Sequence, residues 1–275
     1  MPKIDLKLFR TAEGKVIHID AFKPAEVLGF DKQESERRLA ANLTELEDLQ
    51  YRLYADQKTS VLIVLQGIST AGKDGTIRKV MSAFNPQGVQ VHSFKEPEGQ
   101  EKVHDYLWRV HMACPPRGTI GIFNRSHYED VLITRVDELI DENRATRRIH
   151  HINEFERLLV EEGTVIIKLF LNISKDEQLD RLNSRLDDPT RNWKFSKADV
   201  REHAHWDRYS DVFGDSLTRT NTKYAPWWIV PSNHKWFRNL VVSEIVLQAL
   251  RNLKLEWPKT ETNLAQSRRT LKATE

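Results

Sequence analysis

Short apolar runs alternate along the chain with longer segments in which apolar residues recur at helical spacing. The run 60–66 (SVLIVLQ) is rich in β-branched residues, which is typical of a strand buried on both faces of a parallel sheet. Comparable patterns predict further strands at 89–94, 119–123, 164–171 and 227–230. A helix over 31–56 is predicted from leucines that lie on one helical face: Leu39, Leu43, Leu46, Leu49 and Leu53.

Helix-sized segments separate the predicted strands. They lie at 73–84, 102–114, 126–136, 144–161 and 236–253. Ser174, with Glu177 three residues later, forms a capping-box pattern that opens another helix. Alternating strands and helices indicate an α/β fold with three layers, in which helices flank a central parallel sheet.

The chain contains no internal repeat and no linker long enough to divide it, which predicts a single domain over 1–258. The segment 187–222 is less regular and rich in charged residues and tryptophan, so we interpret it as an excursion over the active site. We place a lid at about 174–223. The polar tail 259–275 is expected to be flexible.

The cysteine count, the net charge and the length of the apolar runs exclude several classes of protein. The single cysteine among 275 residues excludes an intramolecular disulfide. With 42 Lys+Arg against 40 Asp+Glu, a net charge of +2 provides no argument for a nucleic-acid partner. The longest apolar runs, at 61–65 and 165–170, are far shorter than the roughly 20 residues that span a bilayer, and the N-terminus shows no signal peptide. We therefore expect a soluble, cytoplasmic protein that binds neither nucleic acid nor membrane.

The segment 67–75 (GISTAGKDG) follows the most apolar strand and opens a helix. It matches G-x-x-x-x-G-K, a loop whose glycines let backbone N–H groups surround phosphates at a helix N-terminus. Lys73 is the expected catalytic cation at the transferring phosphate. The predicted phosphate- or nucleotide-binding residues of the loop are Gly67, Ser69, Thr70, Ala71, Gly72, Asp74 and Gly75. The alternative is a glycine turn in an ordinary strand–helix unit.

Asp74 departs from the usual form of this loop, because it occupies the position at which Ser or Thr contacts the metal. A carboxylate can ligate Mg²⁺ at that position. We therefore predict that Asp74 is the metal ligand.

A second polar segment, 123–130 (FNRSHYED), lies at the carboxyl end of a predicted strand, where open parallel sheets bind their ligands. Asn124 is predicted to bind the nucleotide, and Arg125 can contact phosphate oxygens through its planar guanidinium. Arg135 lies ten residues after Arg125, on the predicted helix 126–136, and is predicted to reach the same anion. The alternative for Arg125 is an i,i+4 ion pair with Glu129.

Further basic residues are candidates for an anion site. Lys95 follows a predicted strand, and Arg181 and Arg185 lie one helical turn apart, where they could present two cations on a lid. Lys194 belongs to the same region. The eight basic residues between 175 and 208 are balanced by eight acidic ones, so an ordinary solvated surface is the alternative for each of them.

Six ordered motifs resemble those of the type-2 polyphosphate kinases, in particular the subgroup that uses nucleoside mono- and diphosphates. The motifs lie at 65–81, 85–88, 93–97, 121–136, 205–209 and 224–236, and the resemblance covers roughly 25–257. It implies a P-loop kinase core with a helical lid, and reversible transfer of the terminal phosphoryl group of inorganic polyphosphate to AMP or ADP. It also implies dependence on Mg²⁺, with Mn²⁺ as a substitute, and a homo-oligomer, either dimer or tetramer.

The resemblance assigns roles to residues that the motifs already indicate. The family's phosphate loop corresponds to 67–75, its second phosphate motif to Asn124 and Arg125, the arginine after that motif to Arg135, and its basic lid residues to Arg181, Arg185 and Lys194. Ser69 departs from the family, which usually has an acidic residue at this position. Two alternatives therefore stay open: an ATP-dependent nucleoside monophosphate kinase, and a catalytically weakened protein that binds polyphosphate or nucleotide.

Overall fold

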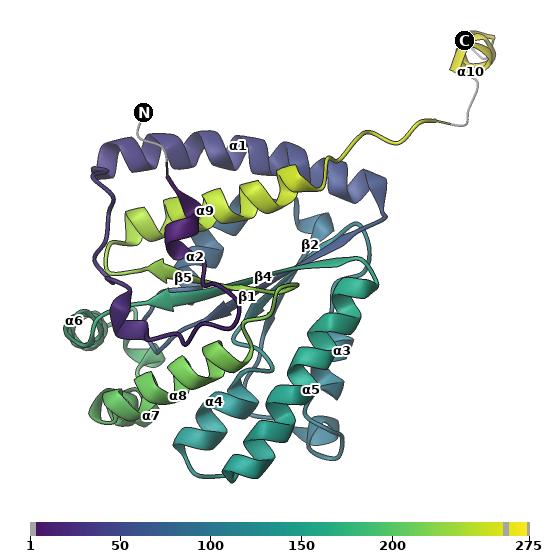
Figure 1. Cartoon of the computed structure of the whole chain (residues 1–275). Coiled ribbons are helices and arrows are strands. Elements are labelled where there is room, and N and C mark those ends of the chain that lie inside the picture. The colour runs from purple at the N-terminus through teal and green to yellow at the C-terminus, as the bar shows by residue number, and fades with distance from the viewer. Residues whose placement is uncertain (1–3, 261–263, 274–275) are drawn as a thin grey trace.

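The computed structural model describes residues 4–260 and 264–273 and has a parallel sheet of five strands at its centre (Figure 1). The strand order is β2-β3-β1-β4-β5. The strands are β1 (Ser60–Gln66), β2 (Val89–Ser93), β3 (Ile120–Asn124), β4 (Thr164–Asn172) and β5 (Trp227–Pro231). The predicted α/β fold with a central parallel sheet is confirmed, and every predicted strand is present to within a residue or two.

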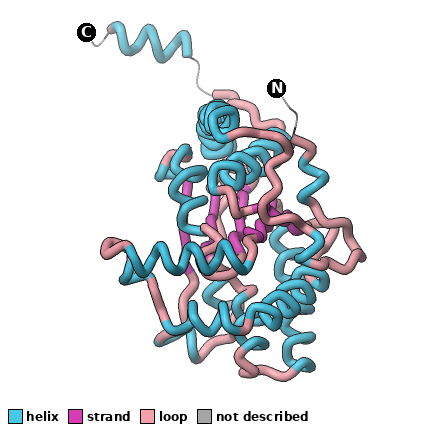
Figure 2. Tube along the Cα trace, turned by 90° about the vertical axis from the view of Figure 1, so that its left-hand side faces the viewer, coloured by secondary structure: helices cyan, strands magenta, loops and turns pink. Residues whose placement is uncertain are grey.

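Helices cover both faces of the sheet, as the two perpendicular views show (Figures 1 and 2). On one side α9 packs against the sheet, and α1 and α2 contact α9; on the other side α5 packs against the sheet, with α4 beside it and α8 next to α4. The α-helices are α1 (Lys32–Asp56), α2 (Lys73–Val80), α3 (Trp108–Met112), α4 (Glu129–Val136), α5 (Glu142–Glu161), α6 (Lys175–Asp187), α7 (Lys197–Ala204), α8 (Trp206–Arg219), α9 (Lys235–Asn252) and α10 (Leu264–Lys272). Short 3-10 helices occupy several of the connections.

The central strand β1 carries no exposed residue, because it is hydrogen-bonded to β3 and β4 and covered on both faces. This burial explains its continuous β-branched composition. Its register places Leu65 beside Asn124 of β3, so the polar segment that follows β3 begins next to the loop that follows β1. All strands are parallel, and their carboxyl ends form one edge of the sheet.

The helix predicted over 102–114 is largely wrong. A 3-10 helix spans Gly99–Lys102, and α3 begins only at Trp108. Between them Asp105 accepts a hydrogen bond from the backbone N–H of Leu107, at 2.9 Å, which favours a turn over a continuous helix. The helix predicted over 126–136 likewise begins later, at Glu129.

The less regular structure expected over 187–222 is also wrong, because α7 and α8 occupy most of this segment. Tyr209, Phe213 and Leu217 are buried at a spacing of four residues, and the charged residues lie between them. The capping prediction at Ser174 is confirmed in part, since its side chain accepts from the backbone N–H of Glu177 at 3.2 Å.

Both ends of the described chain contain ordered structure. Phe9, Ile17 and Phe30 of the N-terminal arm are buried in the core, and α10 forms within the tail. In the described part of the chain no helix is long and apolar enough to cross a membrane. The cytoplasmic location, the domain limits and the flexibility of the tail stay predictions.

Candidate active site

The loop formed by residues 67–75 connects β1 to α2 at the carboxyl edge of the sheet, as predicted. At two positions it requires glycine. Gly67 has a φ of 144°, and a Cβ there would lie 2.7 Å from the carbonyl oxygen of Leu171. Gly72 has a φ of 108°, and its Cβ would lie 1.8 Å from Nη1 of Arg238, which donates to the carbonyl oxygen of Ala71 at 3.4 Å. The close approach of a guanidinium to the loop therefore explains the second glycine.

Arg181 supports the loop from α6. Its Nη1 donates to the carbonyl oxygens of Thr70 and Ala71 at 2.9 and 3.2 Å, and its Nη2 donates to those of Ser232 and Asn233 at 2.6 and 2.9 Å. Nε donates to Glu177 Oε1 of the same helix at 2.7 Å. Burial lowers the pKa of this guanidinium. The structure thus uses Arg181 to connect the loop to the end of β5, which differs from the expected pair of cations presented side by side on a lid.

Lys73 begins α2, and its ammonium lies against the loop. Nζ donates to the carbonyl oxygens of Gly67 and Ile68 at 2.7 and 3.2 Å. Burial, together with the positive charge of Arg125, lowers the pKa of Lys73 to about 8, against the opposing effect of nearby carboxylates. The ammonium therefore lies against the loop, and its contact with phosphate stays a prediction.

Three predicted residues meet at the first turn of α2. Asp74 Oδ1 accepts from Asn124 Nδ2 at 2.9 Å, and Asp74 Oδ2 accepts from Lys194 Nζ at 2.7 Å. Although partial burial acts in the opposite direction, these two hydrogen bonds lower the pKa of Asp74 below its usual value. The end of β3 and the 3-10 helix Asn192–Lys194 thus converge on the ionised carboxylate of Asp74.

Asp74 fits the role of a single carboxylate ligand for Mg²⁺, because it is ionised and its side chain is 63% exposed. Among the described residues no group of three or more His, Cys, Asp or Glu side chains could hold a metal ion. A Mg²⁺ ion at this position would therefore depend on one carboxylate together with phosphate oxygens of the substrate and water, which is a common arrangement for Mg²⁺.

Arg125 stands directly after Asn124 at the end of β3. Its backbone is in the left-handed region, with a φ of 63°, and its N–H donates to the carbonyl oxygen of Leu65 at 3.1 Å. The alternative ion pair with Glu129 is present, at 3.7 Å, but the Arg125 side chain is 49% exposed. An exposed pair of this length contributes little, so the guanidinium remains available to an anion.

The structure does not bring every predicted residue to the loop. Arg135 Nη1 lies 2.7 Å from Asp215 of α8, and its Nη2 lies 3.0 Å from Glu142 of α5. Lys95 is exposed after β2. Arg185, one turn after Arg181, is paired with Asp199 at 3.2 Å. Contact of these side chains with phosphate stays a prediction.

Two carboxylates of α7 contact the loop, and the sequence reasoning missed both. Ser69 donates its hydroxyl to Asp199 Oδ1 and its backbone N–H to Glu202 Oε1, the latter at 2.5 Å. Burial raises the pKa of Glu202 to about 7, while the charge of Lys73 and the hydrogen bond from Ser69 act in the opposite direction. The capping box between Ser196 and Asp199 is a sequence signal for this helix.

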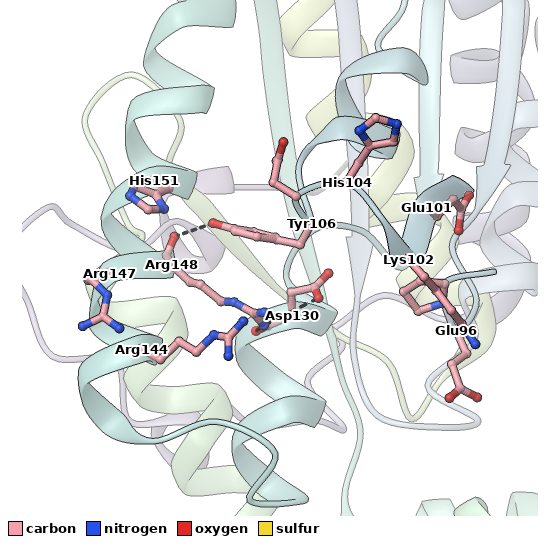
Figure 3. A pocket seen from close by; sticks show the side chains of 12 residues that line it. Glu96, Glu101, Lys102, His104, Tyr106, Asp130, Arg144, Arg147, Arg148 and His151 are labelled. Atoms are coloured by element: carbon pink, nitrogen blue, oxygen red, sulfur yellow. Dashed lines mark hydrogen bonds and ion pairs between the residues drawn. The ribbon is translucent and has the colours of Figure 1, made fainter. Parts of the chain in front are cut away.

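A separate cavity of about 560 Å³ opens beside α5 (Figure 3). Arg148 lies over the ring of Tyr106, 4.8 Å from its centroid, and Tyr106 OH donates to the Arg148 carbonyl oxygen at 3.0 Å. Asp130 also faces this cavity, and its Oδ2 is buried without a hydrogen-bond partner among the described residues. The residues that line the cavity do not include those of the loop 67–75. The cavity is therefore separate from the loop.

Comparison with known proteins confirms the resemblance seen in the sequence. The family model described as polyphosphate kinase 2 matches residues 29–258. An AMP/ADP-polyphosphate phosphotransferase from Meiothermus ruber is 45% identical over 259 residues, which cover 94% of this chain and 97% of that protein. An ADP-polyphosphate phosphotransferase from Rhodopseudomonas palustris is 40% identical over 272 residues, with 94% of each chain covered.

The solved structures give the same result for the fold. The crystal structure of polyphosphate kinase 2 from Arthrobacter aurescens superposes with a TM-score of 0.93 at 40% sequence identity, and the match covers 99% of this chain and 98% of that one. A polyphosphate kinase 2 structure from Pseudomonas aeruginosa, described as putative, matches with a TM-score of 0.80 at 31% identity and covers 85% of this chain and 50% of that one.

Proposed function

The chain belongs to the polyphosphate kinase 2 family, and we propose that it transfers the terminal phosphoryl group of inorganic polyphosphate reversibly to AMP or ADP. The observation that carries this proposal is the group formed by Lys73, Asp74, Asn124 and Arg125 at the carboxyl edge of the sheet. The names of the two relatives include polyphosphate together with AMP or ADP, which supports polyphosphate over ATP as the donor.

Phosphoryl transfer through a loose transition state requires little covalent chemistry from the protein. It depends on holding donor and acceptor in line and on cations around the transferring group. Lys73 and Arg125 would supply two of these cations from the ends of β1 and β3. Arg181 and Arg238 would keep the loop in shape from the other side.

We propose Mg²⁺ as the metal, held by Asp74 and by phosphate oxygens of the substrate. When bound, the ion would neutralise part of the charge on the phosphates. Mn²⁺ is the expected substitute. Lys194, which pairs with Asp74 in the structure, would then turn toward the phosphates.

We also propose that α6, α7 and α8 form the lid, within the predicted segment 174–223. In the structure, Asp199 and Glu202 accept hydrogen bonds from Ser69. A phosphate that approaches the Ser69 N–H must displace Glu202, because both are acceptors for the same donor. Substrate binding would therefore loosen α7 from the loop before the lid closes around the phosphates.

The nucleotide acceptor and the oligomeric state are proposed from the family resemblance. The acceptors are expected to be purine nucleoside mono- and diphosphates, and the protein is expected to be a homo-oligomer. Light scattering after size-exclusion chromatography would give the mass of the assembly, which is to be compared with the 32.1 kDa of one chain.

The proposed reaction is tested by incubating the protein with Mg²⁺, long-chain polyphosphate and either AMP or ADP, and by separating the nucleotides by chromatography. We expect ADP or ATP to form only in the presence of polyphosphate. ADP formed from ATP and AMP without polyphosphate would instead indicate an ATP-dependent monophosphate kinase. Binding of polyphosphate without any product would indicate a catalytically weakened binding protein.

A further inference from the structure

A buried ion pair lies behind the segment that carries Arg125. Lys168 of β4 and Glu156 of α5 are both fully buried, and Lys168 Nζ lies 2.7 Å from Glu156 Oε2. The other carboxylate oxygen of Glu156 accepts from Tyr128 OH at 2.6 Å and lies 3.3 Å from Nε2 of His127. Lys168 Nζ also donates to Tyr128 OH, at 2.9 Å. Two residues that follow Arg125 closely are therefore held by one ion pair.

The protonation of the cluster is consistent with these hydrogen bonds. Burial and the charge of Glu156 raise the pKa of Tyr128 well above its usual value, so its hydroxyl stays protonated and can donate. Burial alone would raise the pKa of Glu156, but the charge of Lys168 and the contact with His127 bring it below its usual value. The Glu156 carboxylate is therefore ionised, and its two oxygens face the ammonium and the phenol.

Burial of an ion pair is by itself weak evidence that the pair stabilises the fold. Charges that leave water lose solvation, and replacement of a buried pair by apolar side chains of similar volume is often neutral or stabilising. In addition, the pair fixes the positions of its partners, because its hydrogen bonds form only when those side chains lie at particular places. Here those partners are the side chains of Tyr128 and His127.

Arg125 needs support of this kind. Its φ of 63° is in the left-handed region, which is unfavourable for a residue with a side chain and persists only where the surroundings impose it. On one side its N–H is bound to the carbonyl oxygen of Leu65. On the other side the chain continues into His127 and Tyr128, which are buried and bound to Glu156. The backbone of Arg125 is thus fixed from both directions.

The same ammonium also contacts the proposed lid. Lys168 Nζ donates at 2.7 Å to the carbonyl oxygen of Thr220, directly after the last residue of α8. Asp215 and Ser216 of that helix contact Arg135, at 2.7 and 3.2 Å. The ion pair therefore connects β4 and α5 both to the Arg125 segment and to the end of α8.

We propose that Glu156, Lys168 and Tyr128 are positioning residues that hold the Arg125 guanidinium at the phosphate site. The inference rests on the proposed function, since it assumes that Arg125 binds phosphate. Removal of the cluster is expected to weaken binding of polyphosphate and slow the transfer through a displaced Arg125, without a corresponding loss of folded structure.

The test combines Glu156→Gln with Lys168→Met, which removes both charges and leaves none unpaired. Affinity for tripolyphosphate is measured by calorimetry without an acceptor, and kcat is measured with ADP. We expect a Kd about tenfold higher and a kcat about tenfold to a hundredfold lower, because a misplacement of about 1 Å can cost this much in rate. In an Arg125→Ala background the same two substitutions should change neither quantity by more than about twofold, since residues that act through one group are not additive.

Leu46→Ala is the matched control, because Leu46 is a fully buried core residue of α1 outside this cluster. It should lower the melting temperature while leaving the tripolyphosphate affinity as in the wild type. If the paired variant does not fold, Tyr128→Phe provides a second variant, which keeps both charges and removes only the shared hydroxyl.

An unchanged affinity in the folded paired variant, or in Tyr128→Phe, would overturn the proposal. So would an equal loss of affinity with and without Arg125. Because binding of tripolyphosphate requires no turnover, these outcomes are distinguishable from failure of the proposed reaction, in which the wild type would bind tripolyphosphate and form no nucleotide product.

Discussion

Lys73 is the residue whose charge decides how strongly the free enzyme binds an anion. Its pKa of about 8, lowered by burial, means that the free enzyme loses this cation as the pH rises through that value. Bound phosphates would raise the pKa again and keep the ammonium protonated. We therefore expect kcat/KM, which reports the free enzyme, to fall above pH 8, and kcat to fall only at higher pH.

The measurement is a pair of pH profiles at saturating Mg²⁺, with polyphosphate as the varied substrate. A kcat/KM that stays constant up to about pH 10, the usual range of a lysine ammonium, would contradict the lowered pKa.

Arg181 is expected to act on stability as well as on binding. Arg181→Ala would leave the carbonyl oxygens of Thr70, Ala71, Ser232 and Asn233 without the guanidinium that they share. Unpaired buried acceptors cost about 1–3 kcal/mol each in unfavourable cases, so we expect a loss of about 3 kcal/mol in the free energy of unfolding, relieved in part by water. The corresponding fall in melting temperature is roughly 6–12 °C.

The matched control is Arg251→Ala, which removes an exposed ion pair with Glu45. Surface pairs of this kind contribute about 0–1 kcal/mol. Equal melting temperatures for Arg181→Ala and Arg251→Ala, measured by calorimetry, would show that Arg181 does not support the loop.

The position of a site residue could be predicted where the residue lies within or next to a recognisable strand or loop motif. Asn124 ends the apolar strand β3 and Arg125 follows it, while Lys73 and Asp74 begin the helix after the loop that follows β1. Their place at the carboxyl edge could therefore be inferred from the pattern alone. Arg238 could not, because it reaches the loop from α9, far along the chain, and no local pattern distinguishes it from other arginines on a buried helix.

Among the elements, α7 contacts the loop through two carboxylates. Ser69 presents a hydroxyl and an N–H to Asp199 and Glu202. An acidic residue at position 69 would place a third carboxylate against these two. Like charges about 4 Å apart repel by about 1–4 kcal/mol, depending on the local dielectric. We therefore expect Ser69→Asp to weaken the contact between α7 and the loop.

Hydrogen exchange measures this effect directly. At pH 8, where Glu202 is ionised, the backbone amides of α7 should exchange about tenfold faster in Ser69→Asp than in the wild type, since about 1.4 kcal/mol corresponds to a factor of ten. Ser82→Asp adds the same charge at an exposed position and should leave α7 unchanged. Exchange in α7 that does not respond to Ser69→Asp would contradict the role assigned to this contact.

The hydrophobic pattern predicted the strands more accurately than the helices. Strands were predicted well, because a buried parallel strand has a composition that few other structures share. The segment 187–222 was misjudged because its many charges obscured the four-residue spacing of Tyr209, Phe213 and Leu217. The helix predicted over 102–114 was overextended because Asp105 caps a turn within it.

At the scale of the whole molecule, a net charge of +2 is compatible with a few cations gathered at one site, where carboxylates accompany them. Lys73, Arg125 and Lys194 lie around the loop. Polyphosphate carries about one negative charge per phosphate, so its binding releases counterions as nucleic-acid binding does. Three contacts would give an affinity that falls about twentyfold to fortyfold between 50 and 200 mM salt.

The test is the KM for polyphosphate as a function of salt, with the KM for ADP measured in parallel. ADP makes fewer phosphate contacts and should respond much less. Equal salt dependence of the two constants would indicate that polyphosphate does not lie along these cations.

Transfer of label from radiolabelled polyphosphate to unlabelled ADP, with Mg²⁺ present, tests the central claim most directly. The wild type should produce labelled ATP. Lys73→Ala, checked by circular dichroism for an intact fold, should produce at least about a hundredfold less, because loss of one transition-state-stabilising group typically costs this much. Label that never enters the nucleotide with the wild type, or that enters equally well with Lys73→Ala, would contradict the account.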